Sequence, residues 1–240
     1  MSLPRFIKSF FNPSPVIDEH IQQRLERWKA LPEPDLAQPF TNIKFIILDV
    51  ETSGFSLRKD QLIAIGACQL INGKIPLSQT LDVILRQEQS SSKKNILIHR
   101  ISRQAQLNGI DPAEALMQFL EFIGKQPLVA FYVGFDKPML NKALKKYLGI
   151  DLNNRTWLDI AFVAPLFFPE HARQHRNLDY WMNLFTIQNS NRHKAISDAI
   201  ATAQVMQVIM KSAPENLKIT ELKRMEAKAM RIHQELHGQK

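Results

Sequence analysis

The chain has 240 residues, 45% of them hydrophobic, which suits one large domain with appendages or at most two small domains. Its 31 basic and 23 acidic residues give a net charge of +8, which is compatible with a polyanionic partner but says nothing about the fold. The single cysteine, Cys68, excludes an intramolecular disulfide and, alone, a thiolate metal site.

The sequence carries no pattern typical of membrane insertion or export. Its apolar runs are all shorter than the roughly 20 residues that a membrane-spanning helix needs. The N-terminal segment has too short an apolar run for a signal peptide and is interrupted by Pro4, Pro13 and Pro15. We therefore expect a soluble cytoplasmic protein with no membrane partner.

The first predicted elements lie outside the core. Residues 16–30 carry apolar side chains at helical spacing and predict an amphipathic helix, while the prolines of residues 31–40 predict an extended connector. We therefore expect residues 1–40 to form an N-terminal extension, residues 41–212 the main domain, and residues 213–240 a C-terminal helix. That last helix could pack on the core or mediate association.

The main domain is predicted to contain a mixed sheet. Three strands joined by tight turns come first, and Asn72-Gly73 is a strong hairpin signal between the second and the third. The expected strands are residues 43–51, 62–70 and 75–85, followed by a polar loop at 87–94 and by shorter strands at 126–133 and 157–159. The expected helices start at residue 112 and cover 135–148, 161–167, 178–185, 195–210 and 217–236. Strands that alternate with helices in this way indicate a mixed sheet with helices on its faces.

The first core strand ends in two carboxylates. Four apolar residues lead into Asp49, Val50 and Glu51, and a run that is apolar on both faces suits a central strand. Because side chains alternate along a strand, Asp49 and Glu51 share a face and lie roughly 7 Å apart. Such a pair resists burial, and a divalent cation would relieve the repulsion. From this strand alone, a solvated strand end explains the pair equally well.

Two later stretches carry the other candidate residues. Asp136 follows a buried strand and a turn at Gly134, a position where an aspartate commonly caps the next helix. His193 lies in a loop five residues before Asp198, at the start of the 195–210 helix, so both side chains could enter one pocket. A neutral imidazole can accept a proton from water near neutral pH. Each of these signals is weak by itself, since the chain has seven histidines.

The motifs are more specific in combination. Asp-x-Glu on a central strand, an aspartate after a later strand and His-x4-Asp at a helix start resemble the DEDDh 3′–5′ exonucleases, the group of the epsilon proofreading subunit of bacterial DNA polymerase III. The resemblance covers about residues 43–211. It implies an α/β, ribonuclease H-like fold: a mixed five-stranded sheet flanked by helices, here with N- and C-terminal helical extensions. Lys194 stands where the sister group has tyrosine, which favours the histidine version.

The resemblance implies a role for each position. Four carboxylates would bind two Mg²⁺ or Mn²⁺ ions: Asp49, Glu51, Asp136 and Asp198. His193 would be the general base that deprotonates the attacking water. Four residues would contact the substrate: Thr52, Gly54, Phe55 and His99. Phe55 would wedge against the terminal base, although packing in the core explains a phenylalanine there equally well.

The sequence departs from the family pattern near these motifs. Phe131, Tyr132 and Val133 replace the usual His-Asn-Ala, so aromatic stacking could replace polar contacts to the terminal nucleotide. Ala64 replaces a glutamate that often precedes Ile-Gly on the second strand. Arg100 replaces a glycine and could reach a phosphate or lie in solvent.

The predicted function is a metal-dependent exonuclease that releases nucleoside 5′-monophosphates from a nucleic-acid 3′ end. DNA is the expected substrate by resemblance, but no residue separates it from RNA, because that choice depends on contacts to the sugar 2′ position. A polymerase or another replication or repair protein is a partner by resemblance only. The alternative is a non-catalytic nucleic-acid or polymerase-binding module on the same fold, which a cleavage assay with Mn²⁺ and then EDTA would distinguish.

Overall fold

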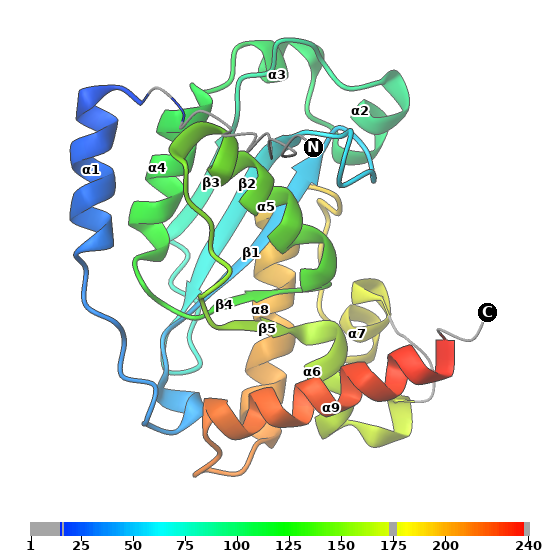
Figure 1. The fold of residues 1–240 in the computed structure, drawn as a ribbon. Helices are drawn as coiled ribbons and strands as arrows, with labels where there is room; N and C mark the ends of the chain where they lie inside the picture. Colours follow the sequence, from blue (N-terminus) through cyan, green and yellow to red (C-terminus); the bar gives the residue numbers. More distant parts are fainter. Residues whose placement is uncertain (1–14, 16, 173–176, 238–240) are drawn as a thin grey trace, which may run out of the picture.

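The computed structural model describes residues 15, 17–172 and 177–237, and its five-stranded sheet lies between two groups of helices (Figure 1). The strands are β1 (Phe45–Thr52), β2 (Leu62–Leu70), β3 (Thr80–Ile84), β4 (Leu128–Ala130) and β5 (Trp157–Asp159). Their order in the sheet is β3-β2-β1-β4-β5. The first three strands pair antiparallel, whereas β4 pairs parallel to β1 and to β5. The predicted mixed five-stranded sheet is confirmed.

The central strand β1 is buried on both faces, which explains its unbroken apolar run. Ile46 and Leu48 enter one hydrophobic core, and Phe45 and Ile47 enter a second core on the other face. Each such side chain contributes about 1.5–3 kcal/mol to stability when it is fully buried. The pattern thus identifies β1 as the strand around which both layers pack.

Each core is closed by its own helices. The first is covered by α1 (Glu19–Lys29), α4 (Pro112–Ile123) and α5 (Val133–Leu148). The second is covered by α6 (Ile160–Phe167), α7 (Leu178–Leu184), α8 (Ala195–Ser212) and α9 (Ile219–His237). Helix α8 packs directly on β1 and β2, so its first turn reaches the end of β1 (Figure 1).

The hairpin after β2 forms at the predicted turn, but the third strand is shorter than predicted. Asn72 and Gly73 both have positive φ, 49° and 69°, between the paired residues Ile71 and Lys74. Pro76 has no N–H for the ladder, and its carbonyl accepts the N–H of Gln79 at 2.8 Å. The ladder therefore resumes only at the start of β3, and the prediction of a strand from residue 75 was wrong.

Two short helices occupy a region that the sequence did not assign to helix. These are α2 (Lys93–His99) and α3 (Arg103–Leu107), and the first of them begins inside the polar loop predicted for residues 87–94. Ser92 caps α2 by accepting the N–H of Asn95 at 3.3 Å, and Ser102 caps α3 at 3.1 Å. Helices of five and seven residues are too short to show a periodic apolar face, so their serine caps were the only local signal.

The terminal extensions both pack on the main domain. Helix α1 lies along α4 (Figure 1), and Trp28 Nε1 donates to the carbonyl of Gly124 at 2.9 Å. Helix α9 packs on α6, so the C-terminal helix follows the first of its two predicted alternatives, packing on the core. A short 3₁₀ helix, η1 (Phe40–Asn42), joins the two ends, because the Phe40 N–H donates to Leu217 O at 2.8 Å. The division at residues 41 and 212 stays a prediction.

None of the helices in the described ranges is long and apolar enough to cross a membrane.

Candidate active site

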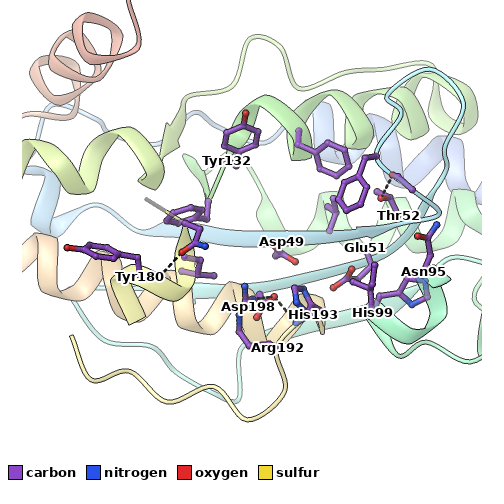
Figure 2. Close-up of a pocket in the computed structure, with 18 residues that line it drawn as sticks. Asp49, Glu51, Thr52, Asn95, His99, Tyr132, Tyr180, Arg192, His193 and Asp198 are labelled. Carbon is purple, nitrogen blue, oxygen red and sulfur yellow. Dashed lines mark hydrogen bonds and ion pairs between the residues drawn. The ribbon is translucent and has the colours of Figure 1, made fainter. Parts of the chain in front are cut away.

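Three acidic side chains converge at the end of β1. Asp49 and Glu51 come from the strand and Asp198 from the first turn of α8, and one carboxylate oxygen of each lies within 4.8 Å of the others (Figure 2). Gly66 on β2, directly opposite Asp49, makes this possible. A Cβ at that glycine would lie 2.0 Å from the backbone N of Ile196, so α8 could not approach the strand over any larger residue.

Asp136 lies beside this cluster and is not one of its three members. It is 4% exposed and lies in the first turn of α5. Its carboxylate accepts hydrogen bonds from the backbone N–H of Val50 and from the backbone N–H of Asp136 itself. The N-cap of α5 is Tyr132, so the alternative interpretation of Asp136 as a helix cap is wrong. Burial, and then the charge of Asp159, raise the pKa of Asp136 well above its usual value.

The carboxylates of β1 are held in a protein environment that opposes their ionisation. Burial raises the pKa of Asp49 well above its ordinary value, and the charges of Asp136 and Asp198 raise it further. Burial, followed by the charges of Asp49 and Asp198, raises the pKa of Glu51 to about 9. Hard divalent cations prefer such all-oxygen sites and would compensate the repulsion, so these residues fit Mg²⁺ or Mn²⁺.

The loop before α8 wraps around Asp198. Asn189 Nδ2 donates to Asp198 Oδ1 at 2.7 Å, and the His193 N–H donates to Asp198 Oδ2 at 3.0 Å. His193 has a left-handed φ of 62°, which places its exposed side chain in the lining of the same cavity as Asp198 (Figure 2). Arg192, which the sequence did not single out, forms an ion pair with Asp198 and lowers the pKa of both Asp49 and Glu51.

The acidic cluster opens into a cavity of about 570 Å³ that aromatic rings also line; the carboxylates are called its acidic end, and Phe55 and Tyr132 its aromatic end. Phe55 is 79% exposed and lies 6.2 Å from Phe135 between ring centroids, so the interpretation of Phe55 as a core residue is wrong. Tyr132 is 51% exposed and has a left-handed φ of 78°. Its backbone N–H donates to Asp159 at 3.0 Å, which fixes the start of α5. A cavity of this size is suitable for a nucleotide.

The other predicted substrate contacts line the same cavity. Thr52 Oγ1 donates to the carbonyl of Gly54 at 2.7 Å, and a Cβ at Gly54 would lie 2.6 Å from Asp60 Oδ2. His99 is 2% exposed; its Nδ1 accepts the N–H of Ile101 at 3.0 Å and its Nε2 lies 3.1 Å from Ser91 Oγ. Both nitrogens of His99 are thus engaged within the protein, and a substrate contact would involve the edge of its ring.

Two residues near the cavity have structural explanations that the sequence did not provide. Arg100 ends α2 with a φ of 57°, a conformation that glycine adopts most easily, which accounts for the glycine expected there by resemblance. Its side chain is exposed. Asn95 lines the cavity and donates to the carbonyl of Ser53, so α2 braces the turn after β1.

A mixed sheet ordered in this way, with carboxylates at the end of its central strand, is the ribonuclease H-like fold of the DEDD 3′–5′ exonucleases. The RNase T family model, described as an exonuclease, matches residues 46–206. The chain therefore belongs to this exonuclease family, a family of phosphodiester hydrolases. The family predicted from the acidic and histidine motifs is confirmed.

Among curated proteins the chain is similar to much longer polymerases. It is 31% identical over 193 residues to the PolC-type DNA polymerase III of Clostridium perfringens, covering 77% of this chain and 12% of that protein. The Bacillus subtilis polymerase of the same type is 28% identical over 171 residues, covering 71% of this chain and 12% of the relative. The chain thus spans about an eighth of the length of these relatives.

Solved structures show the same fold at lower sequence identity. Escherichia coli exonuclease I in complex with a dT13 oligonucleotide is similar with a TM-score of 0.60 and 17% identity, over 70% of this chain and 41% of that one. Exonuclease X in complex with 5′ overhanging duplex DNA has a TM-score of 0.58 and 17% identity, over 76% of this chain and 99% of that one.

Proposed function

We propose that this protein is a metal-dependent 3′–5′ exonuclease that hydrolyses nucleic acid, preferably DNA, to nucleoside 5′-monophosphates. The observation that carries the proposal is the convergence of three carboxylates within 4.8 Å of one another beside a cavity of about 570 Å³. Membership of the exonuclease family supports the reaction, and the DNA ligands of the similar structures support the substrate class.

The carboxylates would hold two Mg²⁺ or Mn²⁺ ions. Asp49, Glu51 and Asp198 form the cluster, and Asp136 beside it supplies a fourth carboxylate. When bound, the ions make a water molecule more acidic and offset the negative charge that develops on the phosphate. Burial and neighbouring charges raise the pKa values of Asp49, Glu51 and Asp136 without metal, and a bound cation would favour the ionised form of these three carboxylates.

His193 would act as the general base. Its backbone N–H is bonded to Asp198 at 3.0 Å, which keeps the imidazole beside the acidic cluster while leaving the side chain exposed to the cavity. The imidazole would accept the proton of the attacking water. A neutral imidazole is suited to this step near physiological pH.

The aromatic end of the cavity would bind the 3′-terminal bases. Phe55 and Tyr132 offer exposed rings, and base–aromatic stacking is worth about 1–3 kcal/mol per base. Stacking is available to any base, so these rings would give affinity with little sequence preference. Thr52 and Gly54 would shape the wall between the rings and the carboxylates.

A polymerase or another replication or repair protein is the proposed protein partner. Support comes from the PolC-type polymerases, 12% of whose length corresponds to this chain. In this proposal the main domain is residues 41–212, and the faces of α1 and α9 that point away from it would be available for association.

A cleavage assay tests the proposal against a non-catalytic binding module. Single-stranded DNA labelled at the 3′ end should release labelled mononucleotide at once with Mn²⁺, whereas DNA labelled at the 5′ end should shorten stepwise. EDTA should stop both reactions, and RNA of the same sequence measures the preference for DNA. Binding without release at any Mn²⁺ concentration would support the module and contradict the exonuclease.

A further inference from the structure

Arg192 reaches the acidic site from the loop that precedes α8 (Figure 2). Its Nη1 pairs with Asp198 Oδ2, while its Nε and Nη2 donate to the two carboxylate oxygens of Asp179 at 2.6 and 3.3 Å. The side chain of Arg192 is 24% exposed and that of Asp198 only 6% exposed. The guanidinium is therefore shared between one carboxylate of the candidate metal site and one carboxylate outside it.

The contacts of Asp198 fill one of its two carboxylate oxygens. Oδ1 accepts from Asn189, and Oδ2 accepts from both Arg192 and the backbone N–H of His193. A carboxylate oxygen has two lone-pair sites, so Oδ2 is fully engaged. A cation can bind this oxygen only if one of its two donors moves away.

Of the two donors, Arg192 is the one that can leave. The His193 N–H belongs to the main chain next to α8, and moving it would disturb the helix start. The guanidinium can withdraw by rotation of the Arg192 side chain together with the half-exposed side chain of Asp179 that it bonds. Its departure when a divalent ion arrives leaves the carboxylates neutralised, since the +2 charge of the ion more than replaces the +1 charge of the guanidinium.

We propose that Arg192 is an internal counter-cation that competes with divalent ions for Asp198 Oδ2 and thereby lowers the metal affinity of the site. The proposal rests on the proposed function in one respect, namely that the acidic cluster binds a divalent ion. The opposite role is a structural prop, in which Arg192 holds Asp198 in position for the ion. The two roles predict changes of opposite sign when the guanidinium is removed.

Calorimetric titration of the full chain with Mn²⁺ alone tests this proposal. Arg192→Gln should bind Mn²⁺ about tenfold more tightly than the wild type, because a charge-assisted hydrogen bond no longer has to be broken. The rise in melting temperature caused by Mn²⁺ should increase with it. Arg192→Lys keeps the charge but lacks the planar guanidinium, so its affinity for Mn²⁺ should lie between those of the wild type and Arg192→Gln.

Arg24 provides a matched control. It also bridges two carboxylates, those of Glu114 and Glu121, and its side chain is 11% exposed, but it lies on α1 away from the cavity. Arg24→Gln should lower the melting temperature and leave the affinity for Mn²⁺ unchanged. A change of affinity in this variant equal to that in Arg192→Gln would overturn the proposal.

The remaining outcomes separate this inference from the function that it rests on. Equal or weaker Mn²⁺ binding by Arg192→Gln, with binding retained in the wild type, would overturn the counter-cation and leave the exonuclease proposal intact. Should Arg192→Gln fail to fold, an affinity of Arg192→Lys no tighter than wild type overturns it equally. If no variant and no wild-type protein bound Mn²⁺, the metal site itself would be wrong, and both proposals with it.

Discussion

The acidic end and the aromatic end of the cavity differ in how far their side chains are buried. At the acidic end, Asp198 is buried at the junction of α8 and the sheet, and its oxygens accept hydrogen bonds from the surrounding loop. At the aromatic end, Phe55 is 79% exposed and Tyr132 is 51% exposed. Gathering buried like charges opposes folding, whereas an exposed ring contributes little to stability. Changes at the acidic end should therefore alter stability and chemistry together, and changes at the aromatic end binding alone.

The largest effect is expected at Asp49. Asp49→Asn should reduce cleavage of labelled DNA to the detection limit, because a carboxylate of the metal cluster is lost. The metal-free variant should unfold at the same temperature as wild type or higher, since a carboxyl group whose ionisation the site opposes is replaced by a neutral amide. Asp111→Asn, at the exposed cap of α4, should leave activity unchanged, as asparagine caps equally well. Substantial cleavage activity in Asp49→Asn would contradict the metal-dependent mechanism.

His193→Ala should show the next largest effect and separate a base from a ligand. The cleavage rate should fall by about 10²–10⁴, the usual contribution of a general base. The stabilisation by Mn²⁺ should persist, because the backbone N–H that bonds Asp198 remains. His20→Ala, on the exposed face of α1, is the control and should match wild type in both measurements. Loss of Mn²⁺ stabilisation in His193→Ala would make His193 a ligand or a structural prop.

Phe55→Ala tests the aromatic end. Loss of one stacked base should weaken binding of single-stranded DNA about 5- to 150-fold, corresponding to about 1–3 kcal/mol. The melting temperature should barely change, since the ring is 79% exposed. Leu77→Ala removes a side chain that is 68% exposed at the β2–β3 turn and should affect neither quantity. A large fall in melting temperature for Phe55→Ala would contradict the comparison between the two ends.

The last prediction is a dependence of stability on pH that arises from Glu51 in the acidic cluster. The pKa of Glu51 is raised from 4.5 to about 9 in the folded protein, so folding favours its protonated form. Its contribution to stability is present below pH 4.5 and is lost as the pH rises towards about 9. The melting temperature in EDTA should therefore fall across this range, and less steeply in Glu51→Gln. Identical slopes for both proteins would show that Glu51 does not control this dependence.

The amino-acid sequence by itself determined the central strand, the hairpin turn and the family. The apolar run into Asp49 identifies a strand buried on both faces. Asn72-Gly73 forms the turn after β2 through local backbone preferences. The acidic and histidine motifs could be recognised because their order along the chain is a property of the sequence. All three depend on residues that are near in sequence or that occur in a fixed order.

Tertiary structure alone decided which of these residues meet and how they are held. Phe55 is 79% exposed although Asn95 and Lys142 bond to the backbone of the turn that carries it, and no local pattern shows this. The approach of α8 depends on Gly66, which lies far from Asp198 in sequence. Arg192 joins the site because its loop folds back against Asp179 and Asp198. Such contacts arise from long-range packing of side chains, which the periodicity of a single segment does not encode.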